Sequence, residues 1–496
     1  MLSRTAGADR QARPAQDQGS PAASRRAGWR AVARRHWPAG LLLAAGLALR
    51  VAAQVSYRPA LFYIDTPRYL YDSQGMDPVG YKGPLLAILA VANFDAVAAV
   101  QHLLGLAMAV LLYLLLLRRG VARWLAALAI APLLLDAYQV QNEQTIMPGT
   151  WFEALIVGGL AILLWRPGAT WRRAAAAGLL LGTSATFAQV GEALLLPGVI
   201  YLLAAGGGWR RAAARAGALA AAFVLPILAY SAGSYLLTGS FFLSHSGVTS
   251  FYGRLAAAAD CGTLTLPRTE QGMCPTPAQQ ARGPDWLEYG PGSPIRPYYA
   301  NLPRPETDSL ISDFNHRVLT QQPARVLGAW TRDVVKLFAL TRTTSPGDTP
   351  ISRWQFQLAY PYYQHSRPAD VAASVHRFGG GLPAVWHPGA VFLRSYQLGG
   401  GYAPGPLLAL CTLAGAAGAA VLLLRRRAGP AAHQLALGSL LCFTSALFLL
   451  LVSDLFEFSW RYQLPALVTL VPAGALGISA VAAAVRSGRR PAESAD

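Results

Sequence analysis

Long apolar runs separated by short polar segments make up most of this 496-residue chain. A helix that crosses a membrane needs roughly 20 mostly apolar residues, and about ten runs approach that length. These runs lie at residues 37–55, 96–117, 124–140, 147–165, 174–190, 192–205, 216–237, 404–424, 433–452 and 464–485. The pattern predicts an all-α polytopic membrane protein with about ten transmembrane helices.

The runs divide the chain into five segments. We expect a disordered basic tail at 1–36, an N-terminal transmembrane catalytic module at 37–237, an extracytoplasmic loop region at 238–403, C-terminal transmembrane helices at 404–485 and a second tail at 486–496. The transmembrane module holds about seven helices and the C-terminal part about three. The first outer loop covers residues 56–95. The loop region, whose first part is rich in proline and glycine, is expected to be irregular there rather than a second domain.

Two stretches predict helices that lie at the membrane surface. Residues 84–93 are apolar but too short to cross a bilayer, which favours an interfacial helix. Within residues 307–340 apolar side chains recur at steps of three and four. This spacing predicts an amphipathic helix that lies on the membrane or caps a cavity.

Composition and charge agree with a membrane protein. The chain is 53% hydrophobic and only 13% charged, whereas soluble proteins carry about 25% charged residues. The net charge is +18, and its arginines gather in short linkers between apolar runs, as the positive-inside rule describes. With ten spans every cluster falls on one side, so both termini are expected in the cytoplasm of a multi-pass cell-membrane protein. The distribution argues against nucleic acid as a partner.

The first apolar run leaves two alternatives open. Its span length and the long basic stretch before it favour a retained anchor over a cleaved signal peptide. Arg50, near the outer end of this run, either extends its side chain to the interface or faces a functional site.

The first outer loop carries the residues that point most clearly to chemistry. The sequence D-T-P-R-Y occupies residues 65–69, and K-G-P-L follows at 82–85. A carboxylate, an arginine, a lysine and tyrosines at a membrane surface suggest chemistry on a phosphate-bearing, membrane-held substrate. For Asp65 the alternative is an N-cap of a short helix whose first turn contains Pro67.

Further candidates lie in the other outer loops. Glu143 is a carboxylate of the second outer loop, and Arg461 and Tyr462 lie in the last one. For Glu143 the alternative is a solvated loop residue, and for Arg461 it is a salt bridge to Asp454 or Glu457.

Cysteine and histidine usage adds little to the site. Cys261 and Cys274 lie in the loop region, where an oxidising environment permits a disulfide between them. The histidines of this region, His365, His376 and His387, have a spacing that fits no standard metal site, which favours surface or packing roles.

The two motifs resemble the D-E-x-R-Y and K-P-P-L signatures of GT-C type glycosyltransferases that use polyprenyl-phosphate donors. The aminoarabinose transferases and the protein O-mannosyltransferases belong to this superfamily. The R-Y-Q-L-P sequence at 461–465 is similar to the family's R-Y-x-x-P element. Two positions depart from the pattern: Thr66 stands where the family has a second acid, and Gly83 replaces a proline.

The resemblance implies an inverting transfer of a sugar from a polyprenyl-phosphate donor to an extracytoplasmic acceptor. On this basis Asp65 is the general base and Glu143 a second catalytic carboxylate, which orients the acceptor or holds a metal. The donor phosphate is expected to contact five side chains of the two motifs and the last loop: Lys82, Arg68, Arg461, Tyr69 and Tyr462. No cofactor is certain, although a divalent metal is possible for the family; Thr66 weakens any site built on an acid pair.

The sequence leaves the acceptor open among a protein, a lipid and a cell-wall glycan. The alternative function is a flippase or transporter of a lipid-linked sugar, which predicts internal repeats or broken helices with charges near the bilayer midplane. No clear repeat is present, and the ionisable residues lie near the outer ends of the spans.

Overall fold

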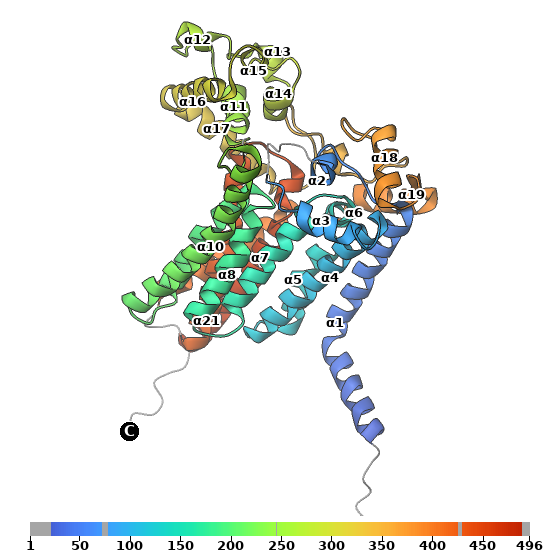
Figure 1. The fold of residues 1–496 in the computed structure, drawn as a ribbon. Helices are drawn as coiled ribbons and strands as arrows, with labels where there is room; N and C mark the ends of the chain where they lie inside the picture. The colour runs from blue at the N-terminus through green and yellow to red at the C-terminus, as the bar shows by residue number, and fades with distance from the viewer. Residues whose placement is uncertain (1–20, 72–77, 245, 425–428, 489–496) are drawn as a thin grey trace, which may run out of the picture.

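The computed structural model describes residues 21–71, 78–244, 246–424 and 429–488. A bundle of long helices is topped at one end by shorter helices (Figure 1). The bundle consists of α1 (Pro21–Ser56), α4 (Phe94–Arg118), α5 (Arg123–Leu135), α6 (Ala137–Gln144), α7 (Gly149–Leu164), α8 (Trp171–Ala185), η1 (Gln189–Leu194), α9 (Leu195–Ala204), α10 (Trp209–Thr238), α20 (Gly405–Ala420), η3 (Val421–Leu424), α21 (Pro430–Asp454), η4 (Trp460–Gln463) and α22 (Ala466–Gly488).

The elements at the top come from two parts of the chain. The first outer loop gives β1 (Tyr57–Arg58), α2 (Thr66–Leu70) and α3 (Lys82–Leu89). The loop region gives α11 (Gly247–Ala258), α12 (Arg268–Gln271), α13 (Pro277–Gln280), α14 (Gly283–Tyr289), α15 (Arg296–Asn301), α16 (Arg304–Gln321), α17 (Pro323–Lys336), η2 (Ile351–Trp354), α18 (Pro368–Phe378), β2 (Ala384–Val385) and α19 (His387–Leu398). The strands pair antiparallel, Tyr57 opposite Val385.

The number of membrane spans differs from the prediction. Each of the ten expected runs is largely helical, but six helices are long and apolar enough to cross a membrane, or seven if the bent pair α5 and α6 counts as one. α7 has 16 residues and α8 has 15, and such helices are about 24 Å long, less than the roughly 30 Å of a bilayer core. The all-α membrane class is confirmed among the described residues, whereas the count of ten is not.

Close backbone contact between α8 and α10 shows how the bundle is packed. A Cβ atom at Gly178 would overlap the backbone oxygen of Leu219, and one at Gly182 would overlap that of Phe223. Small residues four positions apart let two membrane helices approach closely enough for extensive van der Waals contact.

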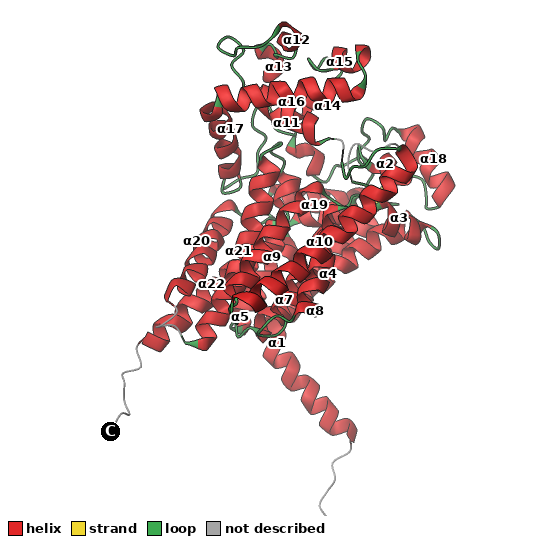
Figure 2. Ribbon diagram, turned by 60° about the vertical axis from the view of Figure 1, so that its left-hand side comes forward, coloured by secondary structure: helices red, strands yellow, loops and turns green. Residues whose placement is uncertain are grey.

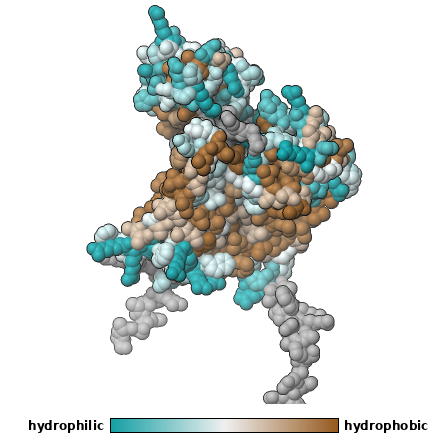
Figure 3. Space-filling view, viewed as in Figure 1, coloured by the Kyte–Doolittle hydropathy of each residue, from teal (hydrophilic) through white to brown (hydrophobic). Residues whose placement is uncertain are grey.

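The polar ends of the bundle agree with a membrane orientation. Arg119 donates to the backbone oxygen of Leu164 and to Gln434 Oε1, so the ends of α4 and α7 and the start of α21 meet at one arginine-bearing end. An apolar band separates this end from the polar top (Figure 3). Residues 21–35, predicted to be disordered, are helical in α1, which is interrupted at His36; alanine and arginine are good helix formers. Residues 1–20 lie outside the described part of the chain.

The third expected span bends by 52° between α5 and α6. Asp136 stands at the break and accepts hydrogen bonds from the backbone N–H groups of Tyr138 and Gln139, so it caps α6. On the other side, the buried Arg50 donates to the backbone oxygens of Leu133 and Leu134 at the end of α5. A cation at the C-terminus of a helix and an anion at an N-terminus both stabilise the break.

Residues 247–336 (α11–α17), which we name the capping subdomain, have a hydrophobic core of their own that includes Tyr252, Leu287 and Phe314. Cys261 and Cys274 form a disulfide within it. The subdomain stands on the end of the bundle (Figure 2), where Trp330 Nε1 donates to the Leu451 backbone oxygen at 3.0 Å.

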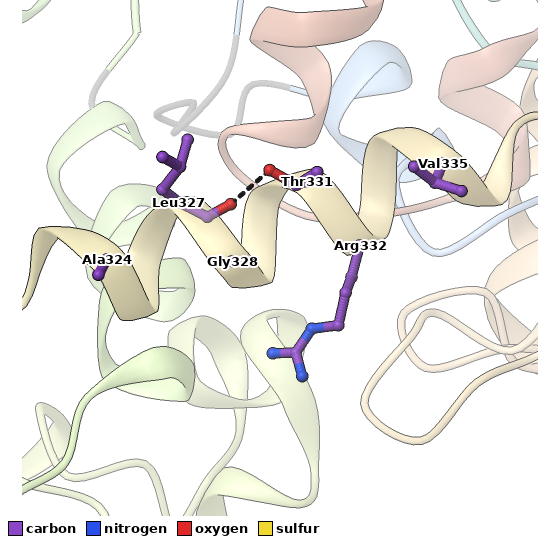
Figure 4. A pocket seen from close by; sticks show the side chains of 6 residues that line it. All are labelled: Ala324, Leu327, Gly328, Thr331, Arg332 and Val335. Atoms are coloured by element: carbon purple, nitrogen blue, oxygen red, sulfur yellow. Dashed lines mark hydrogen bonds between the residues drawn. The ribbon is translucent and has the colours of Figure 1, made fainter.

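The expected single helix within 307–340 is two helices, α16 and α17, separated at Gln322. The reason is Pro323, because proline lacks an N–H group and disfavours helical geometry in the residue before it. One face of α17 is open to its surroundings (Figure 4). Ala324, Leu327, Gly328, Thr331, Arg332 and Val335 line this face.

Candidate functional site

Asp65 lies at the start of α2, between two arginines. Its Oδ1 is 2.8 Å from Arg68 Nη2, and its Oδ2 is 4.0 Å from Arg461 Nη1. The side chains of Asp65, Arg68 and Arg461 are 19%, 22% and 16% exposed, so the group is partly shielded but open to a ligand. Asp65 occupies the N-cap position of α2, yet its carboxylate makes no capping hydrogen bond. The carboxylate therefore forms ion pairs with the arginines and does not cap the helix.

A network of backbone and threonine contacts fixes the position of α2. Thr66 is fully buried; its Oγ1 accepts from the Tyr63 N–H at 2.8 Å and donates to the Ile146 backbone oxygen at 3.1 Å. Leu61 pairs with Thr145 in a short parallel bridge. The segment that carries Asp65 is thus attached to the chain that follows α6.

Arg461, in η4, is enclosed by aromatic rings. Its guanidinium lies 4.7 Å from the ring of Trp354, 4.8 Å from that of Tyr462 and 5.7 Å from that of Tyr63. Nη2 also donates to Tyr462 Oη at 3.0 Å. These contacts hold a planar cation in one orientation. Asp454, one of the alternative partners, accepts instead from Gln463 Nε2.

Glu457, the other alternative partner, lies in the loop before η4. Burial raises the pKa of its carboxyl to about 7, with a further increase from Asp285 and an opposing effect of Arg461. Glu457 thus acts on Arg461 electrostatically, whereas the ion pair that Arg461 makes is with Asp65.

The other two residues predicted to bind the donor phosphate lie in different places. Lys82, at the start of α3, donates from Nζ to the Tyr71 backbone oxygen at 3.2 Å, at the far end of α2 from Asp65. Tyr69 is only 4% exposed and packs its ring against Tyr81, 5.3 Å between centroids. The structure therefore brings Asp65, Arg68, Arg461 and Tyr462 together and places Lys82 at the other end of α2.

Glu143 does not join this group. It lies in α6 with no exposed surface, and its Oε1 is 2.7 Å from Arg50 Nη2 while its Oε2 is 3.0 Å from His102 Nδ1. Gln139 Nε2 contacts Glu143 Oε1 at 3.3 Å and Glu153 Oε2 at 2.7 Å. Glu143 is therefore not a solvated loop residue, and Arg50 does not extend to the interface, since only 1% of its side chain is exposed.

Two residues that the sequence did not single out lie beside Asp65. Asp285, in α14 of the capping subdomain, is 3.5 Å from Arg353 of η2. Arg353 also interacts electrostatically with Tyr63. Burial raises the pKa of Asp285, Asp65 raises it further, and the arginines 353 and 461 lower it. No spacing in the sequence marks these residues, because they come from two short helices of the loop region that are far apart in the chain.

The residues present do not fit a metal centre. Among the described residues no three His, Cys, Asp or Glu side chains gather as metal ligands do. Thr66, which replaces the second acid of the family pattern, turns inward to Ile146.

Comparisons with known proteins give two similar structures. No protein-family model and no curated protein matches the chain. The protein O-mannosyltransferase Pmt1–Pmt2 complex of S. cerevisiae, bound to its sugar donor, matches 44% of this chain and 36% of its own at 17% identity, with a TM-score of 0.32. The archaeal oligosaccharyltransferase AglB of Archaeoglobus fulgidus, in complex with an inhibitory peptide and a dolichol-phosphate, matches 90% of this chain and 51% of its own at 12% identity, with a TM-score of 0.41.

Both similar structures have the GT-C type of fold, the type that the two sequence motifs resemble. This chain spans about a third of the first and half of the second. Both TM-scores lie below 0.5.

Proposed function

We propose that this protein is an integral membrane glycosyltransferase that transfers a sugar from a polyprenyl-phosphate donor to a hydroxyl acceptor. The observation that carries the proposal is the carboxylate of Asp65 held between the guanidinium groups of Arg68 and Arg461. Such a site combines a proton acceptor with cations suited to a phosphate, at the polar end of an apolar bundle (Figure 3).

The reaction is an inverting displacement. The acceptor oxygen attacks the anomeric carbon as its proton passes to Asp65, and the bond between that carbon and the phosphate oxygen breaks. The phosphate departs with its negative charge stabilised by Arg68 and Arg461, with Tyr462 as a hydroxyl donor. Lys82 and Tyr69 belong to the wall of the same site, with Lys82 as a point charge for the lipid phosphate.

Glu143 has a positioning role in this proposal. Its ion pair with Arg50 and its contact with His102 fix α6, and the residue that follows Glu143 accepts the Leu61 N–H at 3.0 Å. Leu61 precedes Asp65 by four residues in the chain. Glu143 therefore acts on Asp65 through the backbone.

The membrane orientation follows from the charges. The arginine-bearing end of the bundle faces the cytoplasm under the positive-inside rule, which puts both termini inside and Asp65 outside. A flippase is not favoured, because the break in the third span is occupied by the protein's own side chains. Arg50 fills one side, and Arg342 binds Asp136 on the other with Nη2 to Oδ2 at 2.7 Å.

The proposal is tested with purified protein in nanodiscs, sugar-loaded polyprenyl phosphate and a cell-envelope extract that supplies the hydroxyl acceptor, by measuring release of the free polyprenyl phosphate. Replacing a general base lowers the rate by about 10²- to 10⁴-fold, so Asp65→Asn is expected to lose turnover while Asp308→Asn keeps it. Asp308 pairs with Arg304 at 3.7 Å in the capping subdomain and serves as the control. An Asp65→Asn enzyme as fast as the wild type would overturn the assignment. A comparison of envelope glycans with and without the protein then identifies the acceptor.

A further inference from the structure

The capping subdomain contributes a carboxylate to the arginines around Asp65. Asp285 Oδ2 lies 3.5 Å from Arg353 Nη1, and the two side chains are 35% and 29% exposed. Arg353 in turn interacts with Tyr63, whose ring also lies under Arg461. Three segments far apart in the sequence, α2, η2 and η4, thus present guanidinium groups to one place, and α14 covers it.

Asp65 and Asp285 both interact electrostatically with Arg461. Arg461 is 4.0 Å from Asp65 and also acts on Asp285, while the two carboxylates repel each other. Two carboxylates that compete for the same arginines oppose each other's ionisation. Another anion can therefore replace one of the two carboxylates, because the positive charge of the guanidinium groups stays balanced.

The ion pair of Asp285 with Arg353 is weaker than a buried ion pair elsewhere in this protein. Asp285 approaches Arg353 with one oxygen at 3.5 Å in a partly exposed position, whereas the buried pair of Arg342 and Asp136 has two contacts, the shorter at 2.7 Å. Partly exposed ion pairs contribute little to stability. A phosphate offers more acceptor oxygens and more charge than a carboxylate to the same forked donors.

We propose that Asp285 occupies the anion position beside Arg353 that the phosphate of a lipid donor takes on binding. This inference rests on the proposed function and deepens it. It makes Arg353 a phosphate-binding residue and makes Asp285 a competitor that the donor displaces. The capping subdomain itself stays in place, because Lys336 bridges Asp333 and Asp348, each at 2.7 Å, at its base.

The test is direct binding of a sugar-free polyprenyl phosphate to the full-length protein in phosphatidylcholine nanodiscs. Removing the competing charge in Asp285→Asn is expected to tighten binding by about 5-fold, the size of a partly exposed ion pair. Arg353→Gln is expected to weaken binding by about 10-fold, and Asp308→Asn is expected to leave it unchanged. Asp285→Ser carries the same expectation as Asp285→Asn and replaces it if that variant does not fold.

Inorganic phosphate is the second probe. Phosphate that competes with the lipid only at millimolar concentration supports a lipid headgroup as the ligand, whereas phosphate that binds as tightly as the lipid overturns it. Unchanged or weaker lipid binding in both Asp285 variants overturns the displacement proposal alone. A wild-type protein that turns over no polyprenyl-phosphate sugar and binds no polyprenyl phosphate overturns the proposed function instead.

Discussion

Asp65 Oδ2 and Arg461 Nη1 lie 4.0 Å apart, which joins the first loop after α1 to the short helix before α22. Neither residue is more than a fifth exposed. The distance is long for an ion pair, and the guanidinium is oriented mainly by the rings of Trp354 and Tyr462. Arg461 is therefore positioned independently of Asp65 and remains available to a phosphate.

Arg461→Lys is expected to lower kcat/KM for the donor by roughly 10-fold or more, because lysine keeps the charge but cannot stack between the rings or offer a planar fork. The measurement is turnover against donor concentration. Arg304→Lys, at the exposed pair with Asp308, is the matched control. A donor dependence in Arg461→Lys equal to that of the wild type would show that charge alone is needed.

The sequence could predict those features that depend on local pattern. Apolar runs located the helices of the bundle, and the linker residue Arg119 lies where the ends of α4 and α7 meet the start of α21. The motifs placed Asp65, Arg68 and Arg461 among the candidate site residues, and these three lie together. The break at Pro323 also had a local signal, since proline ends helices.

Features that depend on distant contacts could not be predicted. Asp285 and Arg353 come from short helices far apart in the chain, and only the fold brings them together. Glu143 follows an apolar run and therefore resembles a loop carboxylate; its burial depends on Arg50, which belongs to another helix. α7 and α8 end after 16 and 15 residues. The hydrophobic pattern does not fix where these helices end.

Glu143→Ala is expected to destabilise the folded protein strongly. Removing one partner of a buried ion pair leaves the other charge unpaired and costs about 3–5 kcal/mol, and Arg50 would be the residue left unpaired. The measurement is thermal unfolding in detergent. Glu306→Ala, at an exposed position of α16, is the control. An unchanged melting temperature with lost turnover would instead assign Glu143 a direct catalytic role.

Gly105→Ala tests the same network without removing a charge. A Cβ atom at Gly105 would overlap Glu143 Oε1, so the carboxylate would have to move away from Arg50 and His102. Overpacking of this kind costs about 1–3 kcal/mol. Gly217→Ala, where a Cβ atom meets nothing within 4 Å, should be neutral or stabilising by up to about 1 kcal/mol. Equal melting temperatures for the two variants would contradict a tight fit around Glu143.

The stability of the capping subdomain is expected to fall as the pH rises. Glu288 is 8% exposed and accepts from Ser250 Oγ at 2.6 Å and Thr249 Oγ1 at 2.9 Å. Burial raises the pKa of its carboxyl to about 8, although these hydrogen bonds oppose the increase. The folded state therefore binds a proton that the unfolded state, with a pKa near the ordinary value of about 4.3, releases. The stabilisation is fully present below that value and is lost as the pH rises through about 8.

The melting temperature should accordingly drop by several degrees between pH 5 and pH 9, and Glu288→Gln should show a smaller drop. The amide stays neutral at every pH and retains an oxygen for Ser250 and Thr249, so packing and hydrogen bonding are nearly preserved. Part of the dependence is expected to remain, because burial also raises the pKa of Glu457 to about 7. Glu306→Gln, on exposed α16, is the control and should keep the full drop. Identical pH dependence in Glu288→Gln and the wild type would mean that Glu288 ionises in the folded state as easily as in the unfolded one.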